Sequence, residues 1–357
     1  MSLDTVGIED FRCIQRAELP LHDRCNLISG ENASGKTSLL EAIFVLGRAR
    51  SFRTAKVETL IRNGSSAFQL TARVCTEGSA RPLGLRFGKE GIEARYSGRP
   101  VTGLAELATI FPAQAIDPEV HRLIEGGPQE RRRFLDWGVF HVEPNFVEQW
   151  RRYQRALRQR NAALKAGAAP AVVRAWDPEL VEAGELVAAS RARYLQALAP
   201  HVAATAERLL GHPLDIALHQ GWSAERTLQE SVETSWIRDR ERAVTLSGPH
   251  RADVTVRYGG TPARDRISRG QQKLAAAALL LGQLRCDAEL GSRVAALLVD
   301  DPAAELDAGN LERLLKEVVS LPAQLFVTAL DPRNPALANL PEGHRFHVEH
   351  GQVRRLV

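Results

Sequence analysis

The chain has 357 residues, 44% of them hydrophobic, which is enough apolar material for more than one domain. Its formal net charge of +4 permits nucleic-acid binding without requiring it. None of the four cysteines forms a Cys-x-x-Cys pair, which excludes common zinc and redox motifs and favours reduced, mostly buried thiols. With no signal-peptide pattern and no apolar run near the ~20 residues that span a bilayer, we expect a cytoplasmic protein without membrane contact.

The N-terminal third of the chain predicts α/β structure. An apolar run at residues 25–29 predicts a short buried strand, and a glycine-containing loop over 30–37 follows it. Apolar residues at helical spacing over 39–46 predict a helix directly after that loop. Between 67 and 101, three runs alternate apolar and polar residues and predict an antiparallel meander buried on one face.

The middle of the chain, from 118 to 242, has a mostly helical pattern with breaks near Gly126, Gly167 and Gly211. Strand and helix patterns then alternate: a strand over 253–258, a helix over 271–285, a buried parallel strand over 294–299, a helix over 311–319 and a strand over 324–328. We therefore predict an α/β lobe made of residues 1–117 and 243–357, with a helical lobe of residues 118–242 inserted into it.

The loop after the first buried strand matches the pattern Gly-x-x-x-x-Gly-Lys-[Ser/Thr] in full, between a strand and a helix. In such a loop the backbone N–H groups and the helix N-terminus surround phosphates, the lysine reaches the β- and γ-phosphates and the threonine binds Mg²⁺. The alternative is a glycine-containing turn with an exposed lysine. The predicted phosphate-binding residues are Gly30, Glu31, Asn32, Ala33, Ser34, Gly35, Lys36 and Thr37.

Two carboxylates follow the apolar strand that ends at Val299. A carboxylate at the end of a buried strand beside a phosphate-binding loop holds Mg²⁺, which is the predicted role of Asp300. Asp301 is then placed to act as general base toward the attacking water. The alternative is an ordinary charged exit from a strand.

Residues 267–273 resemble the Leu-Ser-Gly-Gly-Gln signature of ABC-type ATPases, and residues 297–307 resemble the Walker B and D-loop run of that superfamily. The order along the chain, with the phosphate-binding loop first and the carboxylates last, is also that of the superfamily. The alternative for Ser268 is a simple N-cap of the helix that follows, which is compatible with a role in the signature.

The ABC resemblance implies a nucleotide site shared by two subunits. The signature residues Ser268, Gly270 and Gln271 are expected to contact the γ-phosphate of ATP that is held by a second copy of the chain. ATP then joins two protomers head to head, and Asp307 is expected to cross the interface.

Several features distinguish the chain from ABC transporter subunits. Asp301 stands where transporters mostly have glutamate, and Ala329 occupies the place of their switch histidine. The helical insertion is long for a transporter, and the sustained heptads of an SMC coiled coil are missing.

The closest resemblance is to the RecF family of bacterial DNA replication and repair proteins. Residues 8–12 are similar to the family's Asn-Phe-Arg opening. Residues 118–137, in which Gly-Gly-Pro is followed by paired arginines and Phe-Leu-Asp, resemble its specific signature. Residues 246–253 are also like a RecF segment.

This resemblance implies an α/β ABC-type P-loop ATPase head, built from a mixed sheet and an antiparallel meander, with a helical lobe inserted between its two halves. It implies ATP and Mg²⁺ as ligands, weak DNA-stimulated ATPase activity and an ATP-dependent homodimer. It further implies ATP-controlled binding of double-stranded or gapped DNA without sequence preference. The implied partners are RecR and RecO, with RecA loading downstream, in recombinational gap repair, replication restart and the SOS response.

Two further residues take roles in the nucleotide site by resemblance. Gln114 is placed like the family's Q-loop glutamine, which senses Mg²⁺ and water, and an ordinary surface glutamine is the alternative. Arg12 is placed to approach the nucleotide, and a plain surface arginine is the alternative.

Arginines in the helical region are the candidates for DNA contacts, because they can neutralise phosphates. Three of them share one helix face by their spacing. The alternative is a solvated face paired with Glu130, Glu143 and Glu148, and the first two arginines can instead hold parts of the protein together. The candidates are Arg131, Arg132, Arg151, Arg155 and Arg158.

Two rival functions remain open from the sequence. One is an ABC transporter ATPase with an unusual insertion. The other is a clamp that binds ATP but barely hydrolyses it, which the residues Asp301 and Ala329 favour.

Overall fold

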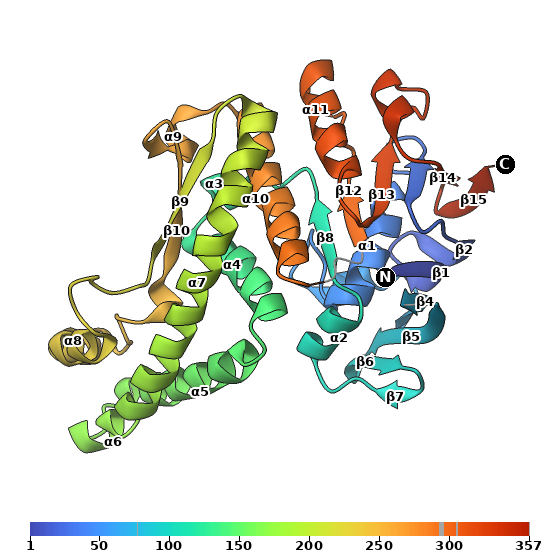
Figure 1. Ribbon diagram of the computed structural model, residues 1–357. Coiled ribbons are helices and arrows are strands. Elements are labelled where there is room, and N and C mark those ends of the chain that lie inside the picture. Colours follow the sequence, from blue (N-terminus) through green and yellow to red (C-terminus); the bar gives the residue numbers. More distant parts are fainter. Residues whose placement is uncertain (77, 293–295, 305, 357) are drawn as a thin grey trace. The chain divides into compact units, whose positions relative to one another are not determined.

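The computed structural model describes residues 1–76, 78–292, 296–304 and 306–356. The chain separates into two compact units, one formed by residues 1–120 with 293–357 and the other by residues 121–292 (Figure 1). The predicted return to the ATPase lobe at residue 243 is therefore corrected to about residue 293. The reason is that the strand over 253–258 and the helix after it pair and pack within the helical unit.

The first unit contains a mostly parallel sheet in the order β15-β14-β3-β13-β12-β8. Only the edge strand β15 runs antiparallel to its neighbour. Every residue of β3, β12 and β13 is buried, as expected for strands covered on both faces. Residues 294 and 295 of the predicted strand lie outside the described residues. The strands are β3 (Cys25–Ser29), β8 (Ala113–Ile116), β12 (Ala296–Val299), β13 (Gln324–Ala329), β14 (Gly343–Glu349) and β15 (Gln352–Leu356).

The second sheet of this unit is antiparallel, in the order β2-β1-β4-β5-β6-β7. It confirms the predicted meander, since alternate residues of β4 are buried and exposed. Phe68 packs against Phe11 and Phe87 on the buried face. The strands are β1 (Ser2–Phe11), β2 (Ile14–Pro20), β4 (Phe68–Thr76), β5 (Ser79–Gly88), β6 (Gly91–Tyr96) and β7 (Arg99–Pro100).

Helix α1 (Lys36–Arg48) packs on strands of both sheets and forms the centre of the first unit. All of its residues except Thr37 are buried, which is typical of a helix surrounded by core. The shorter helices α2 (Leu104–Ile110) and α11 (Ala308–Val319) and the 3₁₀ turns Val57–Leu60 and Pro335–Asn339 complete the unit.

The second unit is mainly helical, and α7 (Asp177–Leu210) runs along both α5 and α10 (Figure 1). Its helices end at the three predicted glycine-containing breaks. The other helices are α3 (Arg122–Glu125), α4 (Pro128–Val142), α5 (Phe146–Lys165), α6 (Pro170–Arg174), α8 (Leu228–Arg242), α9 (Ala263–Arg266), α10 (Arg269–Glu289) and the 3₁₀ turn Pro249–Arg251.

A small sheet in the order β11-β10-β9 adds a strand to residues 118–242, for which a mostly helical structure was predicted. Strand β9 (Leu214–His219) was not predicted, and it pairs antiparallel with β10 (Asp253–Tyr258), which was. The six-residue run after Pro213 alternates only weakly, so its pairing with a distant strand determines its conformation. Strand β11 (Thr261–Pro262) completes the sheet.

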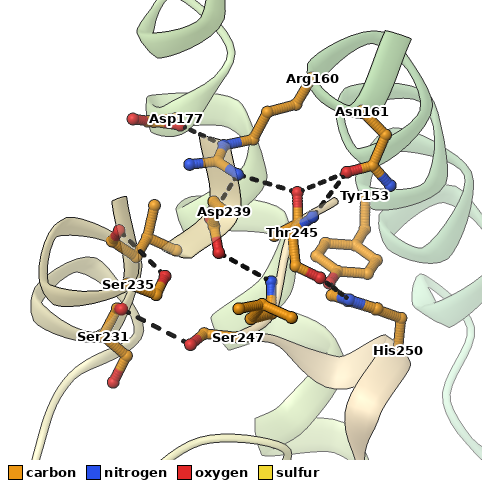
Figure 2. Close-up of polar contacts among 12 residues, drawn as sticks. Tyr153, Arg160, Asn161, Asp177, Ser231, Ser235, Asp239, Thr245, Ser247 and His250 are labelled. Carbon is orange, nitrogen blue, oxygen red and sulfur yellow. Dashed lines mark hydrogen bonds and ion pairs between the residues drawn. The ribbon is translucent and has the colours of Figure 1, made fainter. Parts of the chain in front are cut away.

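A buried polar network fixes the RecF-like segment 246–253 and the residues before it (Figure 2). Arg160 is fully buried and donates to the carboxylates of Asp177 and Asp239, each at 2.7 Å, and to the Thr245 hydroxyl at 2.9 Å. The Asn161 side-chain oxygen accepts from the backbone N–H of Thr245 at 2.8 Å. Buried charges persist only where they are paired, so this arginine ties α5 to α7, α8 and the segment.

His250 closes the same network. The Tyr153 hydroxyl donates to its Nδ1 at 2.5 Å, and its Nε2–H donates to the Thr245 carbonyl at 3.0 Å, because that oxygen can only accept. The neutral ring satisfies both contacts. Burial lowers the pKa of His250 to about 4.

Among the described residues, no helix is both long enough and apolar enough to span a membrane.

The His250 ring predicts a specific loss of stability in acid. Its native pKa of about 4 lies below the ordinary 6.5, so its contribution is complete above pH 6.5 and is lost as the pH falls toward 4. We expect His250→Gln to flatten the pH dependence of the free energy of unfolding over this window, by roughly 3 kcal/mol at most. Urea unfolding at pH 7.5 and 4.5 measures this pH dependence. His219→Gln, at an exposed ring of the same unit, should keep the wild-type dependence, and equal slopes for all three proteins would contradict the assignment.

Candidate functional site

A cavity of about 420 Å³ lies where the predicted phosphate-binding loop meets the predicted acidic pair. Its walls come from the loop and the start of α1, from the end of β12, and from two residues that the sequence did not indicate. The lining residues are Cys13, Asn32, Ala33, Gly35, Lys36, Thr37, Ser38, Arg53, Asp300 and Asp301.

The loop has a conformation that needs glycine at two positions. Gly30 and Gly35 have φ angles of 153° and 117°, in the region that L side chains rarely adopt. A Cβ on Gly30 would lie 2.3 Å from the Val348 carbonyl oxygen. Ala33 has φ of 61° without being glycine, which costs on the order of 1 kcal/mol and marks a locally strained loop.

Two polar groups of the loop are placed to meet a phosphate. The Lys36 ammonium donates to the carbonyls of Gly30 and Glu31 at 2.7 and 2.8 Å, so it folds across the loop. Burial lowers its pKa, against the opposing charges of Asp301 and Asp300. The Ser34 hydroxyl is buried, and within the described part of the chain it has no hydrogen-bond partner. Both groups fit a bound phosphate.

Asp300 links three elements through its carboxylate. The Thr37 hydroxyl donates to it at 2.9 Å from the start of α1, and the Thr328 hydroxyl donates at 2.8 Å from β13. Burial raises the pKa of Asp300, and the two hydroxyl donors oppose that rise. The Thr37 and Asp300 oxygens are the hard ligands that Mg²⁺ prefers.

Thr328 was missed by the sequence analysis. It is fully buried, donates to Asp300 and accepts the backbone N–H of Asp301 at 2.7 Å. Its only sequence signal is a hydroxyl near the end of an otherwise apolar parallel strand. It therefore contacts the carboxylate of Asp300 and the backbone of Asp301.

Arg53 is the second missed residue. Its side chain is exposed and lines the cavity, and its charge lowers the pKa of Asp300. Since an arginine at the wall of this cavity can bind a phosphate bidentately, Arg53 is a candidate nucleotide ligand. Cys13 lines the same cavity, with its sulfur 3.6 Å from the Ser38 hydroxyl oxygen.

Gln114 does not reach this cavity. Strand β8 pairs with β12 in a register that sets Gln114 opposite Leu297, three residues before Asp300. The glutamine is buried, so it is not a surface residue, and its Oε1 accepts from Arg48 at 2.6 Å. Arg48 ends α1, at the opposite end from Lys36.

The prediction of Gln114 as a Mg²⁺ ligand is therefore wrong, because the register between β8 and β12 sets Gln114 away from Asp300. The backbone N–H of Asp300 donates to the Ile116 carbonyl at 2.9 Å. The residue that follows Ile116 is Asp117, and neither Asp117 nor Gln114 lines the cavity.

Arg12 also lies outside the cavity lining. It forms a bidentate ion pair with the buried Glu41 carboxylate, at 2.8 and 2.9 Å, and donates to the Thr59 carbonyl at 3.1 Å. Arg12 thus anchors the turn after β1 to α1, and its approach to the nucleotide stays a prediction.

Ser268 caps α10 in the second unit, as its structural alternative predicts. Its hydroxyl accepts from the Gln271 N–H at 3.4 Å, and the Gln271 side chain accepts from the Ser268 N–H at 3.0 Å. Both residues are exposed, with Gly270 between them in the first turn. Asp307 caps α11 in the first unit, where the backbone N–H of Asn310 lowers its pKa.

The arginine candidates separate into two groups. Arg131 is buried, forms a bidentate pair with Asp253 at 2.8 and 3.0 Å and donates to the Gly126 carbonyl. Arg132 donates to the Ala252 carbonyl at 2.6 Å. These two stabilise the helical unit, so their prediction as DNA contacts is wrong.

The other three, Arg151, Arg155 and Arg158, are exposed on α5, and none forms an ion pair within the described residues. Their neighbour Arg152 differs, because it pairs with Glu179 at 2.8 Å. The three arginines are therefore exposed as predicted, on a helix that also carries the exposed Glu148 and Lys165.

A family model described as the RecF/RecN/SMC N terminal domain matches residues 2–347. The DNA replication and repair protein RecF of Edwardsiella ictaluri is 41% identical over 99% of both chains. The corresponding protein of Pseudomonas paraeruginosa is 40% identical over 99% of this chain and 97% of its own.

Solved structures also match over nearly the whole chain. One described as the recombination mediator protein RecF-ATP in the RecFOR pathway superposes with a TM-score of 0.89 at 25% identity, over 99% of this chain and 97% of that one. An Smc head bound to the C-winged helix domain of ScpA has a TM-score of 0.59 at 16% identity, over 100% of this chain and 98% of that one. The chain thus has the ABC-type ATPase fold.

The contacts of Thr328 predict a shift in pH dependence. Thr328→Val removes a donor to Asp300, so the pKa of that carboxyl rises further and the pH below which Mg²⁺-dependent nucleotide binding fails moves upward. We expect the affinity for Mg²⁺ at neutral pH to fall about 10- to 100-fold. Fluorescent-nucleotide titrations across pH, with and without Mg²⁺, measure both effects. Thr328→Ser keeps the hydroxyl and should resemble the wild type; equal losses in both variants would point to packing instead.

Proposed function

This chain belongs to the RecF family, and on that premise we propose that it is an ATP-controlled DNA-binding protein of replication and repair. The observation that carries the proposal is that Lys36, Thr37, Asp300 and Asp301 all line one cavity. A relative of similar fold is described with ATP bound.

ATP binding rests on the loop around Lys36. The lysine leaves the Gly30 and Glu31 carbonyls to reach the β- and γ-phosphates, and loop N–H groups and the α1 N-terminus surround them. The orphaned Ser34 hydroxyl gains a partner. Arg53 adds a second positive charge at the cavity.

The residues present also fit Mg²⁺. Thr37 and Asp300 would hold it. When bound, Mg²⁺ neutralises negative charge on the phosphates. The Thr328 hydroxyl keeps the Asp300 carboxylate oriented toward Thr37.

Hydrolysis requires a base near the γ-phosphate, and Asp301 is the candidate. Its backbone is held by Thr328 and its φ angle is 43°. The Asp301 side chain is one methylene shorter than glutamate, and a displacement of about 1 Å from the productive position can cost ~100-fold in rate. Ala329 is buried and offers no polar group. We therefore propose slow hydrolysis that regulates DNA holding.

The exposed start of α10 is the proposed second half of the site. Ser268, Gly270 and Gln271 present a polar helix N-terminus, which attracts anions. In the proposed homodimer this turn contacts the γ-phosphate held by the other protomer. Asp307, at the start of α11, is the proposed crossing residue. The capping role of Ser268 is compatible with this, because its hydroxyl bond at 3.4 Å is long.

DNA holding is assigned to the exposed α5 arginines. Arg151, Arg155 and Arg158 can neutralise phosphates of double-stranded or gapped DNA and carry no base-specific pattern. By family membership the proposed role is gap repair and replication restart with RecR and RecO, RecA loading and support of the SOS response. The relatives are named replication and repair proteins rather than transporter subunits, which favours this role over the transporter alternative.

The composite site predicts how ATPase activity depends on protein concentration. We expect the specific rate to rise with concentration, to increase with double-stranded DNA and to fall at least tenfold in Ser268→Arg. Thr227→Arg is the matched control, because Thr227 forms the same capping box with Glu230 on α8. A loss shared by both variants would indicate damaged capping. A concentration-independent rate would contradict the dimer, and ATP-dependent dimers without turnover would identify the non-catalytic clamp.

The α5 arginines predict salt-sensitive DNA binding. Changing Arg151, Arg155 and Arg158 together to glutamine should reduce the slope of log affinity against log salt by roughly 2 to 3. Fluorescence anisotropy with ATP and a duplex over a salt series measures the slope. The control changes three ion-paired arginines of the same unit, Arg133, Arg152 and Arg193. Equal effects of both triples would mean that net charge alone determines binding, and equal affinity with ATP, ADP and no nucleotide would contradict nucleotide control.

A further inference from the structure

The antiparallel sheet of the first unit has one solvent-facing side. Along β4, Phe68, Leu70, Ala72 and Val74 are buried while the alternating residues are exposed. The same alternation buries Leu83, Leu85 and Phe87 of β5. The opposite side of these strands therefore faces water.

Three arginines lie on this solvent-facing side, and the register places them. Arg95 of β6 is directly opposite Gly84 of β5, which is itself opposite Thr71 of β4. Arg86 is two residues along β5 from Gly84, and Arg73 is two residues along β4 from Thr71. The three arginines thus surround Gly84.

Gly84 leaves the centre of this arrangement open. A Cβ built on it would have no atom within 4 Å, so no neighbouring side chain covers it. Arg73, Arg86 and Arg95 are all exposed, and none forms an ion pair among the described residues. We call this surface the sheet arginine triangle.

The dimensions of the triangle suit a phosphate backbone. Strands about 4.8 Å apart and residues about 3.4 Å apart place the three Cα atoms on a triangle with sides of roughly 8, 12 and 14 Å. One DNA strand presents a phosphate about every 3.4 Å along the helix axis. The longest side therefore spans about four phosphates, within reach of flexible arginine side chains.

The composition of the surface favours DNA over a protein partner. Protein interfaces depend on buried aromatic or aliphatic anchors. The described residues of β4 to β6 offer none on this side, since the partly exposed Ile92 is opposite Phe87 and shares the buried side. Thr71 and the Gly84 backbone add only polar contacts.

We infer that the sheet arginine triangle, Arg73, Arg86 and Arg95, is a second DNA phosphate-binding surface, in the unit that also contains the ATP pocket. The inference rests on the proposed function, because it assumes that the chain holds DNA. It assigns contacts with the DNA phosphate backbone to the first unit as well as to α5.

The test compares two triple variants in the full-length chain. Arg73, Arg86 and Arg95 are changed together to glutamine, and the control changes Arg16, Arg62 and Arg333, which lie in the same unit and are already paired with carboxylates. Anisotropy with a duplex and ATP over a salt series is the readout. We expect the first variant to lose about tenfold or more in affinity at 0.1 M salt, with a slope lower by roughly 2 to 3. The control should behave as wild type.

A gain-of-affinity variant strengthens the test. Glu93 lies directly opposite Arg86, so Glu93→Gln removes negative charge beside the triangle and should tighten binding and steepen the salt slope. Unchanged affinity and slope in the arginine variant, with wild-type binding intact, would overturn this inference alone and leave an acidic protein surface as the partner class. Failure of the wild-type chain to bind DNA would instead overturn the proposed function.

Discussion

The carboxylate of Asp300 is the contact on which the nucleotide site depends. Thr37 reaches it from the start of α1 and Thr328 reaches it from β13, so three segments far apart in the sequence share one acceptor group. Parallel pairing of β3, β13 and β12 brings these segments together at the carboxyl ends of the strands. Burial disfavours the charged carboxylate, and the two hydroxyls offset part of that cost.

The second unit is held together by buried arginines. Arg131, Arg160 and Arg191 each pair with an aspartate and also bond to other polar groups, and Arg191 donates to the Pro249 carbonyl at 2.7 Å. These charge-assisted hydrogen bonds hold the RecF-like segment 246–253, in which Pro249 and Ala252 are also buried.

Local patterns predicted the elements that position the site, because a strand, loop and helix in sequence order need no distant partner. The phosphate-binding loop and the acidic pair were found in this way. Gln114 was placed wrongly because its position depends on the register between β8 and β12, which only the folded sheet defines. Arg131 was misassigned because its partner Asp253 is 122 residues away, and Thr328 gives no local signal beyond one hydroxyl.

The proposed DNA contacts explain how ATP can control DNA without reshaping a protomer. Each surface offers only a few arginines, and phosphate contacts of this kind are weak singly and additive in the logarithm of affinity. If ATP joins two protomers, the number of contacts on one duplex doubles, and the second set binds at the high effective concentration set by the first. Slow hydrolysis at a site with Asp301 and Ala329 would then determine how long both sets stay together. Under this proposal, dimerisation alone would be sufficient to make the time that the protein stays on DNA depend on the bound nucleotide.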